Sequence, residues 1–209
     1  MSTRSNTINA ANLLAGEARM DFDVISRWVP EGAHVLDLGC GDGRLLAKLH
    51  ADKNVTGYGV ELHDDNVHAC VQKGLNVLQQ DLESGLTWFE DKSFDVAILS
   101  LTLQAVHKTE EMIREITRVG KTCIISVPNF GHWPHRWAVL KGRMPVSKTL
   151  PYEWYNTPNV RVLTLLDFVS IADDVGCRVL DQVVLREDRE VKFLPNLRGD
   201  LAVFKLESR

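Results

Sequence analysis

The 209-residue sequence has no run of Lys or Arg, no closely spaced pair of cysteines and no long apolar stretch. With a formal net charge of −4 and no basic stripe, it lacks the surface that neutralises nucleic-acid phosphates. Its four cysteines form no CxxC pair, which argues against a zinc ribbon or a disulfide framework. Residues 1–20 lack the apolar core of a signal peptide, and no later stretch reaches the roughly 20 apolar residues of a membrane span. We therefore expect a soluble cytoplasmic protein that binds neither nucleic acid nor membranes.

Short apolar runs alternate with amphipathic stretches, a pattern typical of βα units around a parallel sheet. Five parallel strands are expected at 33–38, 56–61, 75–79, 94–100 and 122–127. Helices are expected at 43–51, 64–73, 109–119 and 166–175. Two last strands, at about 178–186 and 201–206, are close in sequence, which suggests an antiparallel hairpin at one sheet edge.

The alternation stops at residues 128–158, which hold five of the seven prolines and three of the five tryptophans. We expect a single domain over residues 1–209 with this segment as an irregular insertion. Its aromatic residues, interleaved with Arg136, Arg143 and Lys148, fit a surface that docks a partner. They fit equally a lid packed on its own domain.

The first predicted strand leads into a glycine-rich loop at residues 37–43, with the sequence DLGCGDG. Glycines allow a tight turn and close ligand approach, and open α/β sheets bind ligands at the carboxyl ends of their strands. A dinucleotide fingerprint would have its third glycine at Arg44, and Asp37 and Asp42 would repel a pyrophosphate. S-adenosylmethionine (SAM) carries ammonium and sulfonium groups but no phosphate, and Asp37 is expected to bind the ammonium. The structural alternative is a glycine-rich turn with solvated aspartates.

Two further carboxylates follow the next predicted strands. Glu61 ends the second strand, where an ionised carboxylate can accept hydrogen bonds from both ribose hydroxyls of SAM or of NAD. Asp81 follows the third strand, where it can accept from the adenine amine while a neighbouring N–H donates to the ring. Together they predict a nucleoside cradle. The candidate cofactor-binding residues are Asp37, Gly39, Cys40, Gly41, Glu61, Leu62, Asp81, Leu82 and Ser100.

The segments VLDLGCGDG (35–43), GYGVE (57–61) and QQDL (79–82) resemble successive motifs of the class I SAM-dependent methyltransferases. This resemblance implies a Rossmann-like α/β fold. Its seven-stranded sheet would be mostly parallel with an antiparallel last strand and helices on both faces. It also implies SAM or S-adenosylhomocysteine (SAH) as the cofactor.

Segments outside these motifs resemble a narrower family. SLTLQAV (100–106), VPNFGHW (127–133), GRMPV (142–146) and LPYEWYNTPN (150–159) are similar to the bacterial methionine-biosynthesis family MetW. The similarity runs from about residue 21 to the C-terminus. It implies a role beside homoserine O-acyltransferase, as an activating or regulatory partner, rather than a proven methyl transfer.

No catalytic residue stands out from the sequence. The segment after the fourth strand lacks the Pro-Pro-aromatic motif with which enzymes grip a flipped base, so base methylation is not expected. His107, His132 and Tyr152 are candidate general bases, although His107 fits a plain surface position better. No metal site is expected, because Pro134 would break the helix needed to align His132 with His135.

Three functions are compatible with these features. The favoured one is a SAM-sensing or SAM-binding accessory subunit of methionine biosynthesis. The second is an active methyltransferase on a small molecule, because SAM is already activated and transfer needs only proximity and orientation. The third is an interaction protein that no longer binds cofactor, against which the intact Asp37, Glu61 and Asp81 argue.

Overall fold

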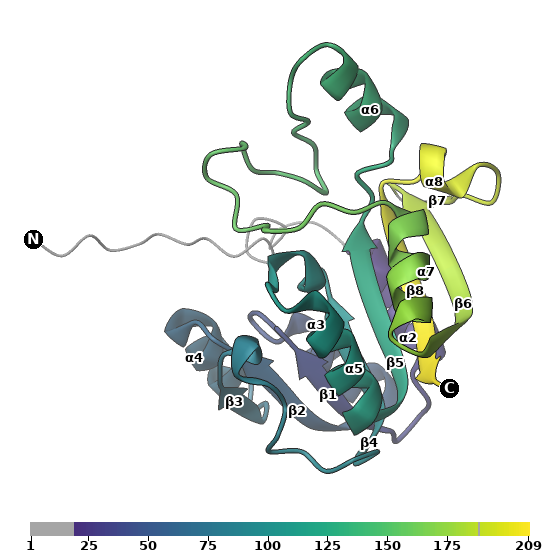
Figure 1. Cartoon of the computed structure of the whole chain (residues 1–209). Coiled ribbons are helices and arrows are strands. Elements are labelled where there is room, and N and C mark those ends of the chain that lie inside the picture. Colours follow the sequence, from purple (N-terminus) through teal and green to yellow (C-terminus); the bar gives the residue numbers. More distant parts are fainter. Residues whose placement is uncertain (1–18, 188) are drawn as a thin grey trace, which may run out of the picture.

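The computed structural model describes residues 19–187 and 189–209, which form a mixed β-sheet with helices on both faces (Figure 1). The expectation that the chain begins without a signal peptide falls almost wholly on residues 1–18, outside the described residues. Within the described part of the chain, no helix is long and apolar enough to cross a membrane. The four cysteines are free thiols.

The described chain has one eight-stranded sheet, in the order β3-β2-β1-β4-β5-β8-β6-β7. The strands are β1 (His34–Leu38), β2 (Thr56–Glu61), β3 (Val77–Gln79), β4 (Phe94–Ser100), β5 (Gly120–Pro128), β6 (Cys177–Arg186), β7 (Arg189–Glu190) and β8 (Leu201–Ser208). The first five pair in parallel, and β8 lies antiparallel between β5 and β6. The predicted Rossmann-like sheet is therefore confirmed. The two-residue strand β7 makes eight strands instead of seven, because so short a strand has no period in the sequence.

The helices are α2 (Met20–Trp28), α3 (Arg44–Lys53), α4 (Asp64–Gln72), α5 (Thr109–Val119), α6 (Trp133–Leu140), α7 (Leu165–Asp174) and α8 (Pro195–Arg198). Short 3₁₀ turns are η1 (Leu82–Ser84) and η2 (Leu103–Ala105). Acidic residues in the first turns of α4 and α5 favour helix initiation there through the helix dipole. A capping box between Thr164 and Asp167 starts α7.

Alternate residues of the central strands enter two hydrophobic clusters, one on each face of the sheet. On β4, Ala97 and Leu99 pack with α5 and α7, whereas Val96 and Ile98 pack with α2 and α3. Side chains alternate between the faces of a strand, so a strand covered on both sides is a continuous apolar run. This burial holds the carboxyl ends of β1, β2 and β4 in a fixed arrangement.

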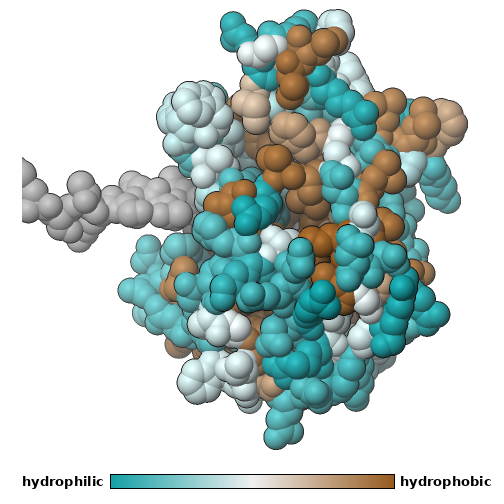
Figure 2. All heavy atoms as spheres, in the orientation of Figure 1, coloured by the Kyte–Doolittle hydropathy of each residue, from teal (hydrophilic) through white to brown (hydrophobic). Residues whose placement is uncertain are grey.

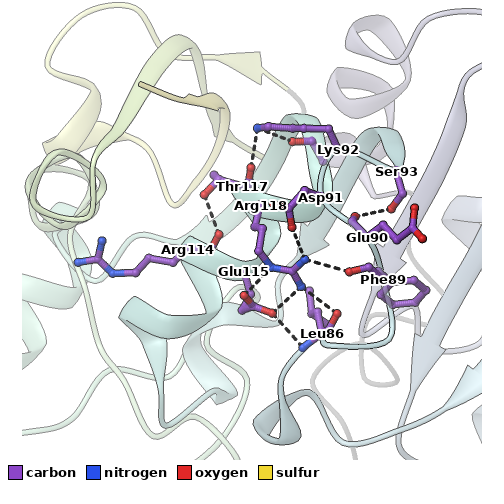
Figure 3. Close-up of polar contacts among 11 residues, drawn as sticks. Leu86, Phe89, Glu90, Asp91, Lys92, Ser93, Arg114, Glu115, Thr117 and Arg118 are labelled. Carbon is purple, nitrogen blue, oxygen red and sulfur yellow. Dashed lines mark hydrogen bonds and ion pairs between the residues drawn. The ribbon is translucent and has the colours of Figure 1, made fainter.

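The loop between η1 and β4 is held on α5 by Arg118 (Figure 3). The guanidinium donates hydrogen bonds to the carboxylates of Glu115 and Asp91 and to the carbonyls of Leu86 and Phe89, at 2.7 to 3.0 Å. Arg118 also lowers the pKa of the Glu115 carboxyl. These contacts fix the loop that follows Asp81 and Leu82.

Residues 129–164, which we call the arm, connect β5 to α7 and project beyond the carboxyl end of β5 (Figure 1). The arm contains α6, whereas the sequence predicted an irregular segment in which Pro134 breaks any helix. That prediction is wrong because Pro134 lies in the first turn of α6, where a backbone N–H has no partner within the helix. From Lys141 to Thr164 the arm forms no helix or strand.

Candidate functional site

The glycine-rich loop follows β1 and turns tightly into α3. Gly39, Gly41 and Gly43 have φ angles of +70°, +57° and +78°, a region that favours glycine. A Cβ at Gly39 would lie 2.6 Å from the Thr102 side chain. The N–H groups of Gly39 and Cys40 donate to the carbonyl of Val60, at 2.8 and 3.1 Å, which ties the loop to β2. The backbone of the loop is thus held beside the ends of β2 and β4.

Glu61 ends β2 and is buried against the loop. One oxygen accepts a hydrogen bond from the N–H of Gly41, and the other accepts from the N–H groups of Leu62 and His63, each at 2.9 Å. The predicted ribose carboxylate is therefore also a structural anchor. A carboxylate has about four lone-pair positions, so roughly one remains for a ligand in this arrangement.

Asp37 is a buried carboxylate at the start of the glycine-rich loop. Only 1% of its surface is exposed, and its Oδ2 has no hydrogen-bond partner among the described residues. Burial raises its pKa to about 7, against a lowering effect of the Arg19 guanidinium, while Glu61 and Asp21 add to the rise. A cationic hydrogen-bond donor at Oδ2 would relieve both effects.

Ser100, at the end of β4, belongs to a buried polar network with the start of α2. Arg19 Nη2 donates to Asp21 Oδ2 at 2.5 Å and to Ser100 Oγ at 2.7 Å, and Ser100 Oγ donates to Asp21 at 2.9 Å. The Arg19 guanidinium also lies 4.3 Å from the centre of the Phe22 ring. This network was not predicted, because Arg19 precedes every motif recognised in the sequence.

A pocket of about 330 Å³ lies at the carboxyl ends of β1, β2 and β4. Five of the nine candidate residues line it, namely Gly39, Glu61, Leu62, Asp81 and Leu82. It contains no Lys or Arg, and its ionisable carboxylates are Glu61, Asp81 and Glu83. The pocket therefore suits a ligand with hydroxyl, amine or cationic groups and does not suit a phosphate.

The other four candidates, Asp37, Cys40, Gly41 and Ser100, line a recess that adjoins the pocket at Gly39. Its lining also includes Arg19, Phe22 and Arg44, and its volume is about 10 Å³, which is room for about one water molecule. The Cys40 side chain points elsewhere, because its sulfur lies 3.9 Å from that of Cys70 on α4. The structure thus brings all nine predicted residues to one region, divided into an open part and a closed part.

One wall of the pocket, formed by η2 and the end of the arm, was not predicted from the sequence; we call it the far wall. Among the residues it did not name are Thr102, Ala105 and Val106 around η2, and Pro158 and Asn159 of the arm. Thr102, Ala105 and Val106 lie within a segment that was used for its family resemblance and for its lack of a Pro-Pro-aromatic motif, not for ligand contacts. Pro158 and Asn159 come from a long irregular segment, and nothing in their local pattern indicates contact with β2.

None of the three candidate bases lines this pocket. His107 is largely exposed and lies 3.5 Å from the carboxylate of Glu83. Burial lowers the pKa of His132 to about 4 and also raises the pKa of Tyr152. Among residues 19–187 and 189–209, no group of three or more His, Cys, Asp or Glu is placed to hold a metal ion.

A second cavity, of about 470 Å³, lies between the start of α5 and α7. Apolar side chains including Leu103, Leu163 and Phe168 line it, and His107 and Arg161 lie at its polar side. It is larger than the first pocket but lacks the glycine loop and the carboxylates that end β2 and β3. We therefore regard the first pocket as the candidate functional site.

A family profile described as methionine biosynthesis protein MetW matches residues 19–206. The chain belongs to the MetW family. A curated relative from Rhodopirellula baltica, named bifunctional methionine biosynthesis protein MetXA/MetW, is 35% identical over 206 residues and is matched by 91% of this chain. The chain spans about a third (33%) of that relative's length.

Solved structures share the fold at low sequence identity. A SAM-dependent methyltransferase from Thermotoga maritima, described as a possible histamine N-methyltransferase, gives a TM-score of 0.66 at 17% identity, over 91% of this chain and 88% of that chain. A SAM-dependent methyltransferase from Mesorhizobium loti gives 0.67 at 16% identity, over 94% and 100%. The fold is therefore that of the class I SAM-dependent methyltransferases.

Proposed function

We propose that this protein binds SAM or SAH in the pocket between the glycine-rich loop and η2. In this role it would be an accessory, regulatory partner of homoserine O-acyltransferase in methionine biosynthesis. The main support for ligand binding is the buried, unpartnered Oδ2 of Asp37 beside a pocket that has carboxylates and no basic side chain. In that pocket the carboxylates of Glu61, Asp81 and Glu83 would repel the phosphates of a dinucleotide. In the adjoining recess an ammonium group would pair with Asp37.

The proposed ligand fits the two parts of the region differently. Glu61 and Asp81 would hold the ribose and adenine in the open pocket, with Leu62 and Leu82 against the ring. Asp37 would bind the ammonium of the amino-acid end, which requires Arg19 and Phe22 to open the closed recess. When bound, SAM would supply an activated methyl group.

Isothermal titration tests the proposed binding of SAM or SAH. We expect SAM and SAH to bind with micromolar dissociation constants, near −8 kcal/mol, which is a common strength for small-ligand sites. NAD, which shares the nucleoside but carries a pyrophosphate, serves as the matched control and should not bind. Binding of NAD without binding of SAM or SAH would refute the proposal.

Two observations support the proposed association with homoserine O-acyltransferase, one from the relative and one from the arm. The name of the R. baltica relative joins MetXA to MetW in one chain about three times as long as the matched segment. The arm exposes large apolar side chains, among them Trp133, Trp137, Leu140, Met144, Trp154 and Tyr155. In Figure 2 brown residues lie on the arm among pale and hydrophilic ones, and a larger brown area lies below it. A surface of this kind is typical of a protein interface.

Charge favours an acidic partner surface. The arm (residues 129–164) carries five basic side chains and one acidic one, Glu153. The basic ones are Arg136, Lys141, Arg143, Lys148 and Arg161. The whole chain has the opposite net charge, −4. We therefore place homoserine O-acyltransferase on the arm through an apolar patch with acidic residues around it. Co-purification of the two proteins, with and without SAM, tests this placement.

An active small-molecule methyltransferase is the second candidate. The fold and the names of its structural neighbours favour it, and the cavity between α5 and α7 offers space for an acceptor. Against it, none of the candidate bases lines the ligand pocket, and one neighbour of the same fold, SpnF, is named a cyclase. Release of SAH from SAM in the presence of a panel of small acceptors would support this candidate.

A further inference from the structure

The end of the arm forms part of the ligand pocket as well as part of the exposed surface. Pro158 and Asn159 line the pocket, while Trp154 and Tyr155, only a few residues earlier, are each 70% exposed. A docked partner and a bound ligand would therefore touch the same short segment. The inference below rests on the proposed function.

Hydrogen bonds hold this segment on the far wall of the pocket. The N–H groups of Val160 and Arg161 donate to the carbonyl of Gln104 in η2, at 2.9 and 3.0 Å. Arg161 Nη2 also donates to the carbonyl of His107 at 2.6 Å. Ala105, in the same turn, and Val106, just after it, also line the pocket, so these hydrogen bonds join the arm to the part of η2 that a ligand would meet.

Asn159 has an unused hydrogen-bond acceptor in this wall. Its backbone N–H donates to Thr157 Oγ1 at 3.1 Å, but its side-chain Oδ1 is buried and has no partner among the described residues. Buried polar atoms nearly always have a partner, so an unpaired one on a residue that lines a pocket is a candidate for a ligand atom. Because this oxygen has almost no exposed surface here, the side chain has to turn toward the pocket to meet the ligand. The adenine amine and the ribose hydroxyls are the donors that a nucleoside brings to Glu61 and Asp81 across the pocket.

We propose that Asn159 accepts a hydrogen bond from the nucleoside part of the bound ligand and thereby couples ligand binding to docking on the arm. Because backbone hydrogen bonds join the arm to η2, a ligand that contacts Asn159 stabilises the arm in the position that it occupies here. A partner that docks on the arm in this position is then bound more tightly, and each binding event strengthens the other by the same factor. Couplings of this kind commonly change affinity by about 5-fold to 150-fold.

The test combines three variants with two measurements. Asn159→Ala removes the acceptor, Asn159→Asp keeps an acceptor oxygen, and Asn156→Ala removes an exposed amide of the arm that does not line the pocket. SAH affinity is measured by isothermal titration. Association with homoserine O-acyltransferase is measured with and without saturating SAH, and circular dichroism checks that each variant is folded.

For the wild type and Asn156→Ala we expect SAH to tighten association at least 5-fold. Asn159→Ala should bind SAH about 10-fold more weakly and associate normally without SAH, but saturating SAH should no longer tighten its association. Asn159→Asp should retain more SAH affinity than Asn159→Ala. Two results would overturn this inference but not the proposed function. One is that Asn159→Ala binds SAH as tightly as the wild type does. The other is that SAH leaves the association of the wild type unchanged or weakens it. Failure of the wild type to bind SAH would instead overturn the proposed function, and this inference with it.

Discussion

At the scale of single residues, Asp37 links the stability of the fold to pH. The unfolded chain releases the proton of this carboxyl near the ordinary value of 3.8, whereas the folded chain releases it near 7. Between these values the folded state binds more protons than the unfolded state. The free energy of unfolding contributed by Asp37 therefore falls as the pH rises from about 4 to 7.

Asp37→Asn should consequently stabilise the protein while weakening ligand binding. Since an amide bears no charge, we expect the variant to unfold with about 1 to 4 kcal/mol more free energy than the wild type above pH 7, a gain that disappears near pH 4. SAM affinity should fall by about 10-fold or more, because the ammonium loses its charged partner. Urea unfolding at both pH values and isothermal titration measure the two effects.

Glu31→Gln, at an exposed position of the turn before β1, is the matched control and should change neither quantity. Equal stability of Asp37→Asn and the wild type at every pH would contradict the assigned burial effect. Unchanged SAM affinity would remove Asp37 from the proposed ligand site.

At the scale of elements, substitutions on the arm can test partner association independently of ligand binding. Truncating a central interface aromatic commonly costs 2 kcal/mol or more, so Trp154→Ala should weaken association with homoserine O-acyltransferase about thirtyfold. SAM affinity and the unfolding midpoint should change little, because the Trp154 side chain is 70% exposed and does not line the pocket.

Trp88→Ala provides the control for this experiment. Trp88 is equally exposed, at 76%, but lies in the loop before β4 rather than on the arm, and its removal should leave association intact. If Trp154→Ala lowers SAM affinity or stability and leaves association intact, the arm is a lid rather than a docking surface. Methyl transfer would then become the better proposal.

The elements differ in how far the sequence predicts them. β4 and β5 were placed nearly to the residue, because strands buried on both faces are uninterrupted apolar runs between polar turns. α6 was missed, because only His135 of its eight residues is buried, so no apolar stripe marks it. The near half of the pocket follows strand ends and could be predicted. The wall formed by Pro158 and Asn159 depends on contacts between residues far apart in the sequence, which no local pattern encodes.

At the scale of the whole molecule, charge is distributed unevenly, with a basic arm on an acidic protein. Association through the arm should therefore weaken as salt rises from about 50 to 300 mM, since ions screen exposed charges. Arg143→Glu should weaken association several-fold at low salt and reduce its salt dependence. Lys53→Glu, in the last turn of α3, makes the same charge change away from the arm and should have little effect. Association that does not respond to salt or to Arg143→Glu would contradict an acidic partner surface.

The reversed direction of β8 has a practical consequence for tethering the protein. Because β8 is antiparallel to β5, its last residues lie at the end of the sheet where the parallel strands begin. Arg209 therefore lies across the molecule from the arm, as the position of C in Figure 1 shows. Residue 19, in contrast, lines the recess beside Asp37. A biosensor chip or fluorophore attached after Arg209 would leave both binding surfaces facing solution, whereas a bulky group attached at residue 19 would lie beside the recess that is proposed to receive the ammonium.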